Sequence, residues 1–139
     1  MGINLLLYHK ADITMGTRVQ TAMVIDDDHD LTSVLSSILE ARKIYTVALH
    51  SLAEAAECLL HLKPTVVFLD NSFPEGLGVN FIKEIKSIDD EIKIVMITAD
   101  EDKWVEDMAK NQKINYFIKK PFNLKVINNV LDKLNMRKW

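Results

Sequence analysis

The sequence predicts a doubly wound α/β fold in which five parallel strands alternate with five helices. Short apolar runs, several of them apolar at successive positions, are separated by segments whose apolar residues recur at helical spacing. Continuous apolar runs are typical of parallel strands that are covered on both faces. Their regular alternation with helical segments indicates βα units that build one sheet between two layers of helices.

Each strand is expected at a short apolar run between two helical segments. The five runs lie at residues 24–25, 45–49, 66–69, 92–97 and 116–118. The first helix repeats leucines at Leu31, Leu35 and Leu39, and the stretches 81–85 and 124–134 show the same helical spacing.

Two further helices complete the pattern. Ser51 and Glu54 form a capping box that opens the second helix, because their side chains can bond to free backbone N–H groups of its first turn. A fourth helix is expected over residues 101–112, where apolar residues again recur at helical spacing.

The chain of 139 residues has a size and composition typical of one globular domain. It contains no internal repeat, low-complexity tract or Pro/Gly-rich linker. We therefore expect a single domain over residues 19–139. Residues 1–18 are expected to form an N-terminal arm that is either disordered or non-native, because a second Met-Gly pair at Met15 offers another start.

Composition excludes several classes of partner. The formal net charge of −3 gives no basic footprint for direct nucleic-acid binding. The single cysteine, Cys58, cannot form an internal disulfide and is consistent with a reducing cytosol. No apolar run approaches the roughly 18 residues that a membrane span needs. These features predict a cytoplasmic protein without a membrane or nucleic-acid partner.

Aspartates gather at the ends of two predicted strands. Asp26 and Asp27 directly follow the first strand, and Asp70 directly follows the third. The strand order 2-1-3-4-5, the flavodoxin-like arrangement, fits five strands best and makes the first and third strands neighbours. Ligands of such sheets bind in the crevice beyond the carboxyl ends of these two strands. The three carboxylates are therefore expected to converge there.

Clustered carboxylates suit Mg²⁺, which binds through one or two of them together with water and phosphate. A carboxylate beside such a cation can also act as a nucleophile toward phosphorus. This chemistry needs donors and positive charge around the phosphoryl oxygens. Thr98, at the end of the fourth strand, and Lys120, at the end of the fifth, supply a hydroxyl and an ammonium group at the same edge of the sheet.

These residues resemble the receiver domain of bacterial two-component response regulators, of the stand-alone type, over about residues 20–137. The acidic pair is similar to that of the family, which implies that Asp26 and Asp27 are carboxylates of a Mg²⁺ site. Asp70 matches the phosphate-accepting aspartate, which also belongs to the metal site. Ser72 falls where a backbone carbonyl completes that site.

The resemblance extends to the later strand ends. Thr98 matches the switch hydroxyl, and Lys120 followed by Pro121 matches a motif whose Lys–Pro bond is cis in the family. Phe117 lies at the family's aromatic switch position but carries no hydroxyl, so a switch there would depend on burial of the ring alone. The sequence departs from the family pattern at three other places, namely Phe73, Leu77 and residues 113–115. None of these is a reactive position.

The resemblance implies a phosphorylation-dependent signalling switch rather than an enzyme with a separate substrate. A sensor histidine kinase or a histidine phosphotransfer protein would phosphorylate Asp70 with Mg²⁺ as cofactor, and the domain would assist only its own phosphorylation and dephosphorylation. Output would reach a downstream protein, or a phosphorylation-dependent homodimer, through the face formed by the fourth helix, fifth strand and fifth helix. The chain ends at Trp139, so no DNA-binding domain is expected to follow unless the chain is a piece of a longer protein.

Two alternative functions use the same residues differently. A haloacid-dehalogenase-type phosphatase would use Asp26 as nucleophile and Asp28 as general acid, but it leaves Asp70 unexplained and lacks an acidic motif after Lys120. Turnover of a phosphoester substrate would identify such a phosphatase. A receiver-like domain that binds partners without phosphorylation is the second alternative. Asp28 and Asp30 are expected to complement the start of the first helix rather than to bind metal.

Overall fold

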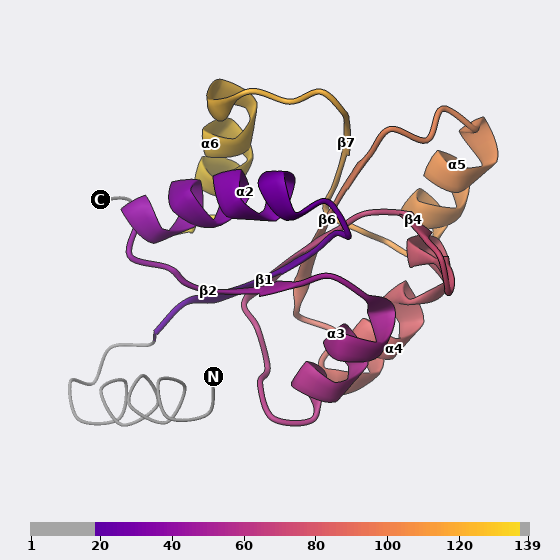
Figure 1. Ribbon diagram of the computed structural model, residues 1–139, viewed down its shortest axis with the longest axis horizontal. Helices are drawn as coiled ribbons and strands as arrows, with labels where there is room; N and C mark the ends of the chain where they lie inside the picture. The colour runs from indigo at the N-terminus through magenta and orange to yellow at the C-terminus, as the bar shows by residue number, and fades with distance from the viewer. Residues whose placement is uncertain (1–18, 137–139) are drawn as a thin grey trace.

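The computed structural model of the protein describes residues 19–136, which form one parallel sheet between two layers of helices (Figure 1). The sheet order β2-β1-β3-β6-β7 confirms the predicted order 2-1-3-4-5 of the five main strands. Its strands are β1 (Thr21–Ile25), β2 (Tyr45–Leu49), β3 (Val66–Leu69), β6 (Lys93–Thr98) and β7 (Tyr116–Lys119). The helices are α2 (His29–Ala41), α3 (Leu52–Leu59), α4 (Ile82–Ile88), α5 (Lys103–Asn111) and α6 (Leu124–Lys133). The predicted arm at residues 1–18 lies outside the described residues.

A small hairpin and a 3₁₀ helix separate β3 from α4. Strand β4 (Ser72–Phe73) pairs antiparallel with β5 (Gly76–Leu77), and the 3₁₀ helix η1 (Gly78–Asn80) leads into α4. These elements were not predicted from the sequence, because two-residue strands are too short to show a periodic pattern. They form the segment that directly follows Asp70.

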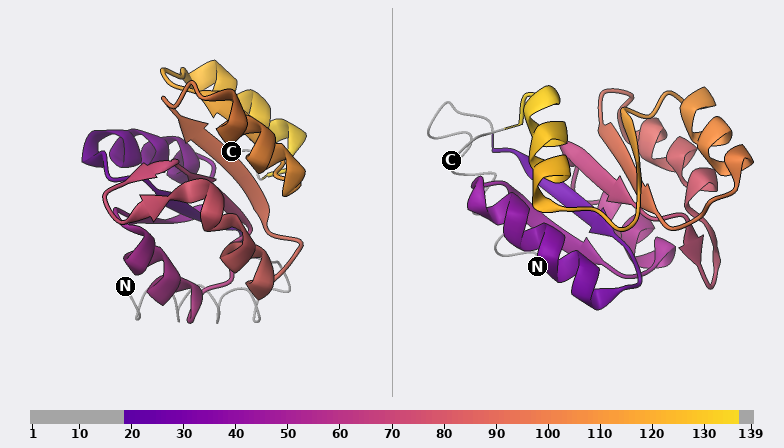
Figure 2. Two further views of the ribbon diagram at one scale, coloured as in Figure 1. Left: turned by 90° about the vertical axis from the view of Figure 1, so that its right-hand side faces the viewer. Right: turned by 90° about the horizontal axis from the view of Figure 1, so that it is seen from above.

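The helices cover both faces of the sheet, α2 and α6 on one face and α3, α4 and α5 on the other (Figure 2). Successive side chains of a strand point to opposite faces. Met23 and Ile25 therefore belong to one apolar core, and Ala22 and Val24 to the other. This double burial explains why the strands are apolar at successive positions. Among residues 19–136, no helix is both long and apolar enough to cross a membrane.

The predicted helix caps are confirmed, with one difference in detail. The Asp28 carboxylate accepts two backbone N–H bonds from the first turn of α2, which begins one residue later. Ser51 caps α3 by accepting the N–H of Glu54 at 3.0 Å. The Glu54 carboxylate returns its bond to the N–H of His50 at 2.9 Å, one residue before the cap itself. Side chains at the helix starts thus satisfy the backbone donors that a helix leaves free.

Helix α5 begins later than the pattern predicted. We expected a helix over residues 101–112, whereas α5 spans Lys103–Asn111. The Asp100 carboxylate accepts the N–H of Asp102 at 3.0 Å and closes a local turn, and the backbone at Asp102 is extended. Asp side chains compete with helices in this way, so the turn delays the helix by two residues.

Arg42, at the C-terminal end of α2, links this helix to α6. Its side chain is charged but buried, with only 3% of the residue exposed. Its Nε donates to the side-chain oxygen of Asn128 at 2.9 Å, and its Nη2 donates to the Asn128 carbonyl at 3.1 Å. Nη2 also lies 3.0 Å from a carboxylate oxygen of Asp132. A buried guanidinium is tolerated because it is both paired and hydrogen-bonded.

Arg42→Met is expected to lower the free energy of unfolding by about 2 kcal/mol, because it keeps the apolar stem but leaves the partners in α6 without their donor. Urea denaturation monitored by circular dichroism measures this. Lys103→Met is the matched control, since Lys103 pairs with Asp107 at 3.2 Å on the exposed surface, where ion pairs contribute little. Equal effects of the two substitutions would contradict the structural role of Arg42.

Candidate functional site

Three carboxylates meet at the carboxyl ends of β1 and β3. The two strands are neighbours with Ile25 opposite Leu69, so the residues that follow them lie at the same edge of the sheet. Asp26, Asp27 and Asp70 each offer a carboxylate oxygen, and the three oxygens lie within 4.8 Å of one another. Asp26 and Asp70 are 2% and 6% exposed, whereas Asp27 is exposed. The structure thus brings together the three acids that the sequence analysis expected to converge.

Lys120 reaches into this cluster from the end of β7. Its Nζ lies 2.9 Å from Asp26 Oδ2 and 3.4 Å from Asp70 Oδ2. The adjacent Lys119 is exposed, as expected from the alternation of side chains along a strand. The peptide bond between Lys120 and Pro121 is cis, as the resemblance implied.

The environment of Asp70 favours its neutral form. Burial and the nearby charge of Asp26 raise the pKa of Asp70 above its usual range, and together they outweigh Lys120, the Asn71 N–H and the Thr98 hydroxyl, which lower it. Burial by itself lowers the pKa of Lys120, but its hydrogen bond to Asp26 and the charges of the two aspartates raise it above its ordinary value. The site therefore contains one positively charged side chain, Lys120, and more negative charge than Lys120 neutralises.

This electrostatic imbalance predicts a pH-dependent stability. A carboxyl whose pKa is raised by folding keeps its proton to higher pH in the folded state than in the unfolded chain, so stability falls as pH rises through the folded pKa. Without divalent cations, Asp70→Asn is expected to unfold at higher urea concentration than the parent protein at pH 7. The difference should vanish below the ordinary carboxyl pKa of 3.8. Parallel urea titrations from pH 3 to 8 measure it, and a variant less stable at pH 7 would contradict this assignment.

Thr98 lies buried at the end of β6, next to the acidic cluster. Its hydroxyl oxygen accepts the backbone N–H of Asp100 at 3.1 Å, and its hydroxyl lowers the pKa of Asp70. The residue therefore lies between the acidic cluster and the loop that connects β6 to α5. Its role as a switch hydroxyl stays a prediction.

The remaining predicted residues lie beside the cluster. Ser72 is exposed at the start of β4, two residues after Asp70. Phe117 lies in β7 opposite Met96, and its ring is half-buried against the apolar core beneath α3, α4 and α5. On the nearby helix α5, Trp104 is 47% exposed.

Asn71, which the sequence pattern did not single out, is fully buried beside Asp70. Its backbone N–H donates to Asp70 Oδ1 at 2.7 Å, and its side-chain oxygen accepts the N–H of Val79 at 3.1 Å. Its Nδ2 donates to Asp100 Oδ2 at 3.0 Å, across 29 residues of sequence. A buried amide with every group bonded indicates a fixed position. Asn71 therefore joins the loop after β3 to the loop after β6.

Helix α5 is held at both ends to the segment that follows Asp70. At its N-terminal side, Asp100 bonds to Asn71. At its C-terminal side, Gln112 Nε2 donates to the carbonyl of Val79 in η1 at 2.9 Å. Two short chains of contacts thus connect the segment after Asp70 with α5.

Comparisons with known proteins agree with this geometry. The family model of the response regulator receiver domain matches residues 22–132. The chemotaxis protein CheY of Thermotoga maritima is 32% identical over 123 residues, which cover 87% of this chain and 99% of that protein. The DNA-binding response regulator MtrA of Mycobacterium tuberculosis is 28% identical over 111 residues, covering 80% and 48% of the two chains. The chain thus spans about half the length of MtrA.

Solved structures show the same fold. A CheY-like receiver domain protein from Methanospirillum hungatei superposes with a TM-score of 0.79 at 17% identity, over 84% of this chain and 94% of that chain. The beryllofluoride-activated NtrC4 receiver domain dimer is 29% identical with a TM-score of 0.73, over 82% and 98% of the chains. These similarities cover nearly all of the described residues.

Proposed function

The chain belongs to the response regulator receiver domain family, a family of signalling domains phosphorylated on an aspartate, and we propose that its phosphate acceptor is Asp70. The observation that carries this proposal is the position of the Asp70 carboxylate, which lies within 4.8 Å of the carboxylates of two further aspartates and 3.4 Å from the ammonium group of Lys120. Asp27 or Asp70 alone would be an ordinary acidic residue at the end of a strand. Only the two together indicate phosphoryl chemistry.

The acidic cluster fits a hard divalent cation, and we assign Mg²⁺ to it. Carboxylate oxygens are the ligands that Mg²⁺ prefers, and three of them lie within 4.8 Å of one another. Asp26, Asp27 and Asp70 would hold the ion, together with the backbone carbonyl of Ser72. When bound, Mg²⁺ supplies positive charge to the phosphoryl oxygens and compensates the excess negative charge of the site.

The chemical step is a phosphoryl transfer to a carboxylate. An oxygen of ionised Asp70 attacks the phosphorus of a phosphohistidine, the new O–P bond forms, and the N–P bond breaks with its electron pair returning to the imidazole. Lys120, whose Nζ lies 3.4 Å from Asp70 Oδ2, would pair with a phosphoryl oxygen. In this function the domain assists only its own phosphorylation and dephosphorylation.

The phosphoryl group would change the position of Thr98 and, through it, the position of α5. A phosphoryl oxygen would attract the Thr98 hydroxyl, whose oxygen accepts the N–H of Asp100. Movement of Thr98 would therefore move Asp100 and strain its bond to Asn71, at the N-terminal side of α5. The half-buried ring of Phe117 would turn inward into the space released. The surface formed by α5, β7 and α6 would change, which is the local event coupled to a two-state element that such switches require.

The partners follow from the family. Receiver domains interact with histidine kinases and downstream effectors, and we propose a sensor histidine kinase or a histidine phosphotransfer protein as the phosphoryl donor. The output would be a downstream protein, or a second copy in a phosphorylation-dependent homodimer, bound through α5, β7 and α6. The NtrC4 receiver domain, described as a beryllofluoride-activated dimer, supports the second form. We propose no direct nucleic-acid contact for the described residues.

Phosphorylation by acetyl phosphate tests this function. Intact mass is measured after incubation of the full chain with acetyl phosphate, with Mg²⁺ and with a chelator in its place. We expect an adduct of one phosphoryl group only with Mg²⁺, and its loss in hydroxylamine, which cleaves acyl phosphates. If no adduct forms under either condition, the receiver-like domain that binds without phosphorylation becomes the better account.

Asn71→Leu tests the path from the site to α5. The substitution preserves volume but removes both side-chain bonds, leaving the buried N–H of Val79 without an acceptor, and we expect a loss of about 2 kcal/mol in stability. Amide hydrogen exchange in α5 should increase more than in α2. Asn80→Leu, on the exposed side of η1, is the control. A uniform increase over the whole fold would show that Asn71 only stabilises the protein.

A further inference from the structure

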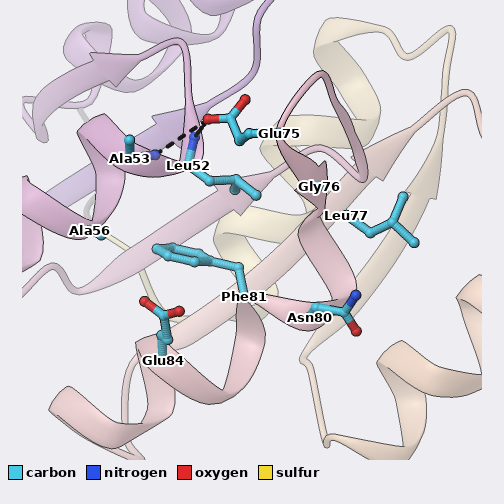
Figure 3. Close-up of a pocket in the computed structure, with 9 residues that line it drawn as sticks. All are labelled: Leu52, Ala53, Ala56, Glu75, Gly76, Leu77, Asn80, Phe81 and Glu84. Atoms are coloured by element: carbon cyan, nitrogen blue, oxygen red, sulfur yellow. Dashed lines mark hydrogen bonds between the residues drawn. The ribbon is translucent and has the colours of Figure 1, made fainter.

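A groove runs between α3 and α4, on a different part of the surface from the proposed output face. It consists of two adjoining hollows of about 420 and 460 Å³ that share Ala53, Ala56 and Glu84 in their walls. The β4–β5 hairpin closes one end of it. Figure 3 shows the Phe81 ring pointing from the start of α4 toward α3, below the Leu52 side chain, with Glu75 and Glu84 at opposite ends of the hollow.

The groove is apolar inside and its other end is open to solvent. Phe81 is buried and forms part of its wall, beside the half-buried Leu52. Leu60 and Ile88, which line the second hollow, are 69% and 41% exposed. Two of the six large hydrophobic side chains that are exposed among residues 19–136 therefore lie at this one place. Leu60 and Ile88 thus offer apolar side chains to an occupant of the second hollow.

The charges along the groove have one sign. Its lining contains Glu57, Glu75 and Glu84, and neither hollow is lined by a lysine or an arginine. Glu75 is already engaged, since its carboxylate accepts the N–H groups of Leu52 and Ala53 at the start of α3. Glu57 makes only an exposed contact of 3.7 Å with His61. Glu57 and Glu84 thus remain to attract a cationic occupant.

We propose that this groove binds an amphipathic helix of a partner protein, with an apolar stripe flanked by lysine or arginine. Helices α3 and α4 contain 8 and 7 residues, about 10–12 Å of groove, which matches two turns of a helix lying between them. An apolar stripe at spacings i, i+3, i+4 and i+7 is the general mode of helix-in-groove recognition. The hairpin at the groove's end begins at Ser72, so an occupant would contact the segment that follows Asp70.

The proposal is tested with a synthetic helical peptide carrying leucines at i, i+3, i+4 and i+7 and lysines on both flanks. A peptide with glutamate for each lysine is the matched control. Both are titrated into the ¹⁵N-labelled, unphosphorylated full chain. We expect at least tenfold tighter binding of the lysine peptide, weakened by added salt. The amide shifts should concentrate on α3, the β4–β5 hairpin and α4.

Three variants locate the binding. Ala53→Arg, at an exposed position of α3, should reduce affinity for the lysine peptide at least tenfold, whereas Val34→Arg on α2 should leave it unchanged. The double variant Glu57→Gln, Glu84→Gln should weaken binding and reduce its dependence on salt. All of these titrations use the unphosphorylated chain, so a failed phosphorylation experiment would leave this result intact.

Other results would overturn the proposal. Equal affinity for the two peptides, or shifts confined to α5, β7 and α6, would remove the groove as a site for a basic helix. Self-association that Ala53→Arg abolishes, measured by sedimentation, would assign the groove to a second copy instead. Shifts in the groove on deletion of residues 1–18 would assign it to the chain's own N-terminal segment.

Discussion

Asp70→Asn is expected to abolish phosphoryl incorporation from acetyl phosphate while the protein remains folded. The amide keeps the shape and the hydrogen bond from the Asn71 N–H, but it removes the carboxylate oxygen that would attack phosphorus. Intact mass should show one phosphoryl group on the parent protein and none on the variant. Circular dichroism should show the same secondary structure for both.

Asp30→Asn is the matched control for this loss. Asp30 lies in the first turn of α2, close in sequence to Asp26 and Asp27 but outside the cluster of three carboxylates. The Asp30→Asn variant should incorporate phosphoryl groups as the parent protein does. Retention of the adduct by Asp70→Asn would place the acceptor elsewhere, and Asp26 or Asp27 would be the next candidates.

Gly78→Ala is expected to cause the largest loss of stability of any single methyl addition in the loop after β3. A Cβ at this position would overlap the carbonyl oxygen of Asp70 and would lie 3.1 Å from Cα of Asn71. Neither backbone atom can move away freely, because Gly78 itself donates to the Asn71 carbonyl at 2.7 Å. We expect the free energy of unfolding to fall by about 4 kcal/mol, which is exceptional for one methyl group.

Chemical denaturation measures this effect, with Asn80→Ala as the control in the same 3₁₀ helix. Asn80 is exposed, and its truncation should change stability by less than about 0.5 kcal/mol. The Gly78→Ala variant should also take up phosphoryl groups more slowly, because the shift needed to relieve the contact displaces Asp70. A Gly78→Ala protein as stable as the parent would show that the loop does not approach as closely as described.

The strand ends explain why most of the candidate site could be predicted from the sequence. In a parallel sheet, residues that follow neighbouring strands meet at one edge, so the positions of Asp26 and Asp70 follow from the strand order alone. The cap at Asp28 was likewise predictable, because it depends on backbone groups only two and three residues away. Local pattern and topology were sufficient for these residues.

Contacts between distant loops could not be predicted in this way. Asn71 acquires its position from Asp100, 29 residues later, and Glu75 caps a helix that begins 23 residues earlier. Asn71 and Glu75 are residue types that ordinary loops also contain, so residue type alone does not reveal these contacts. The late start of α5 has the same origin, because the turn closed by Asp100 replaces its first residues. Such features depend on how loops meet in space, which sequence periodicity does not encode.

Locating the modification shows whether Asp70 itself carries the phosphoryl group. The full chain is phosphorylated with acetyl phosphate and Mg²⁺ and reduced at once with borohydride, which converts an aspartyl phosphate to homoserine. Peptide mass mapping then identifies the altered residue. We predict homoserine at position 70 and unmodified aspartate at positions 26 and 27. Homoserine at either of those positions, with position 70 unchanged, would contradict the account.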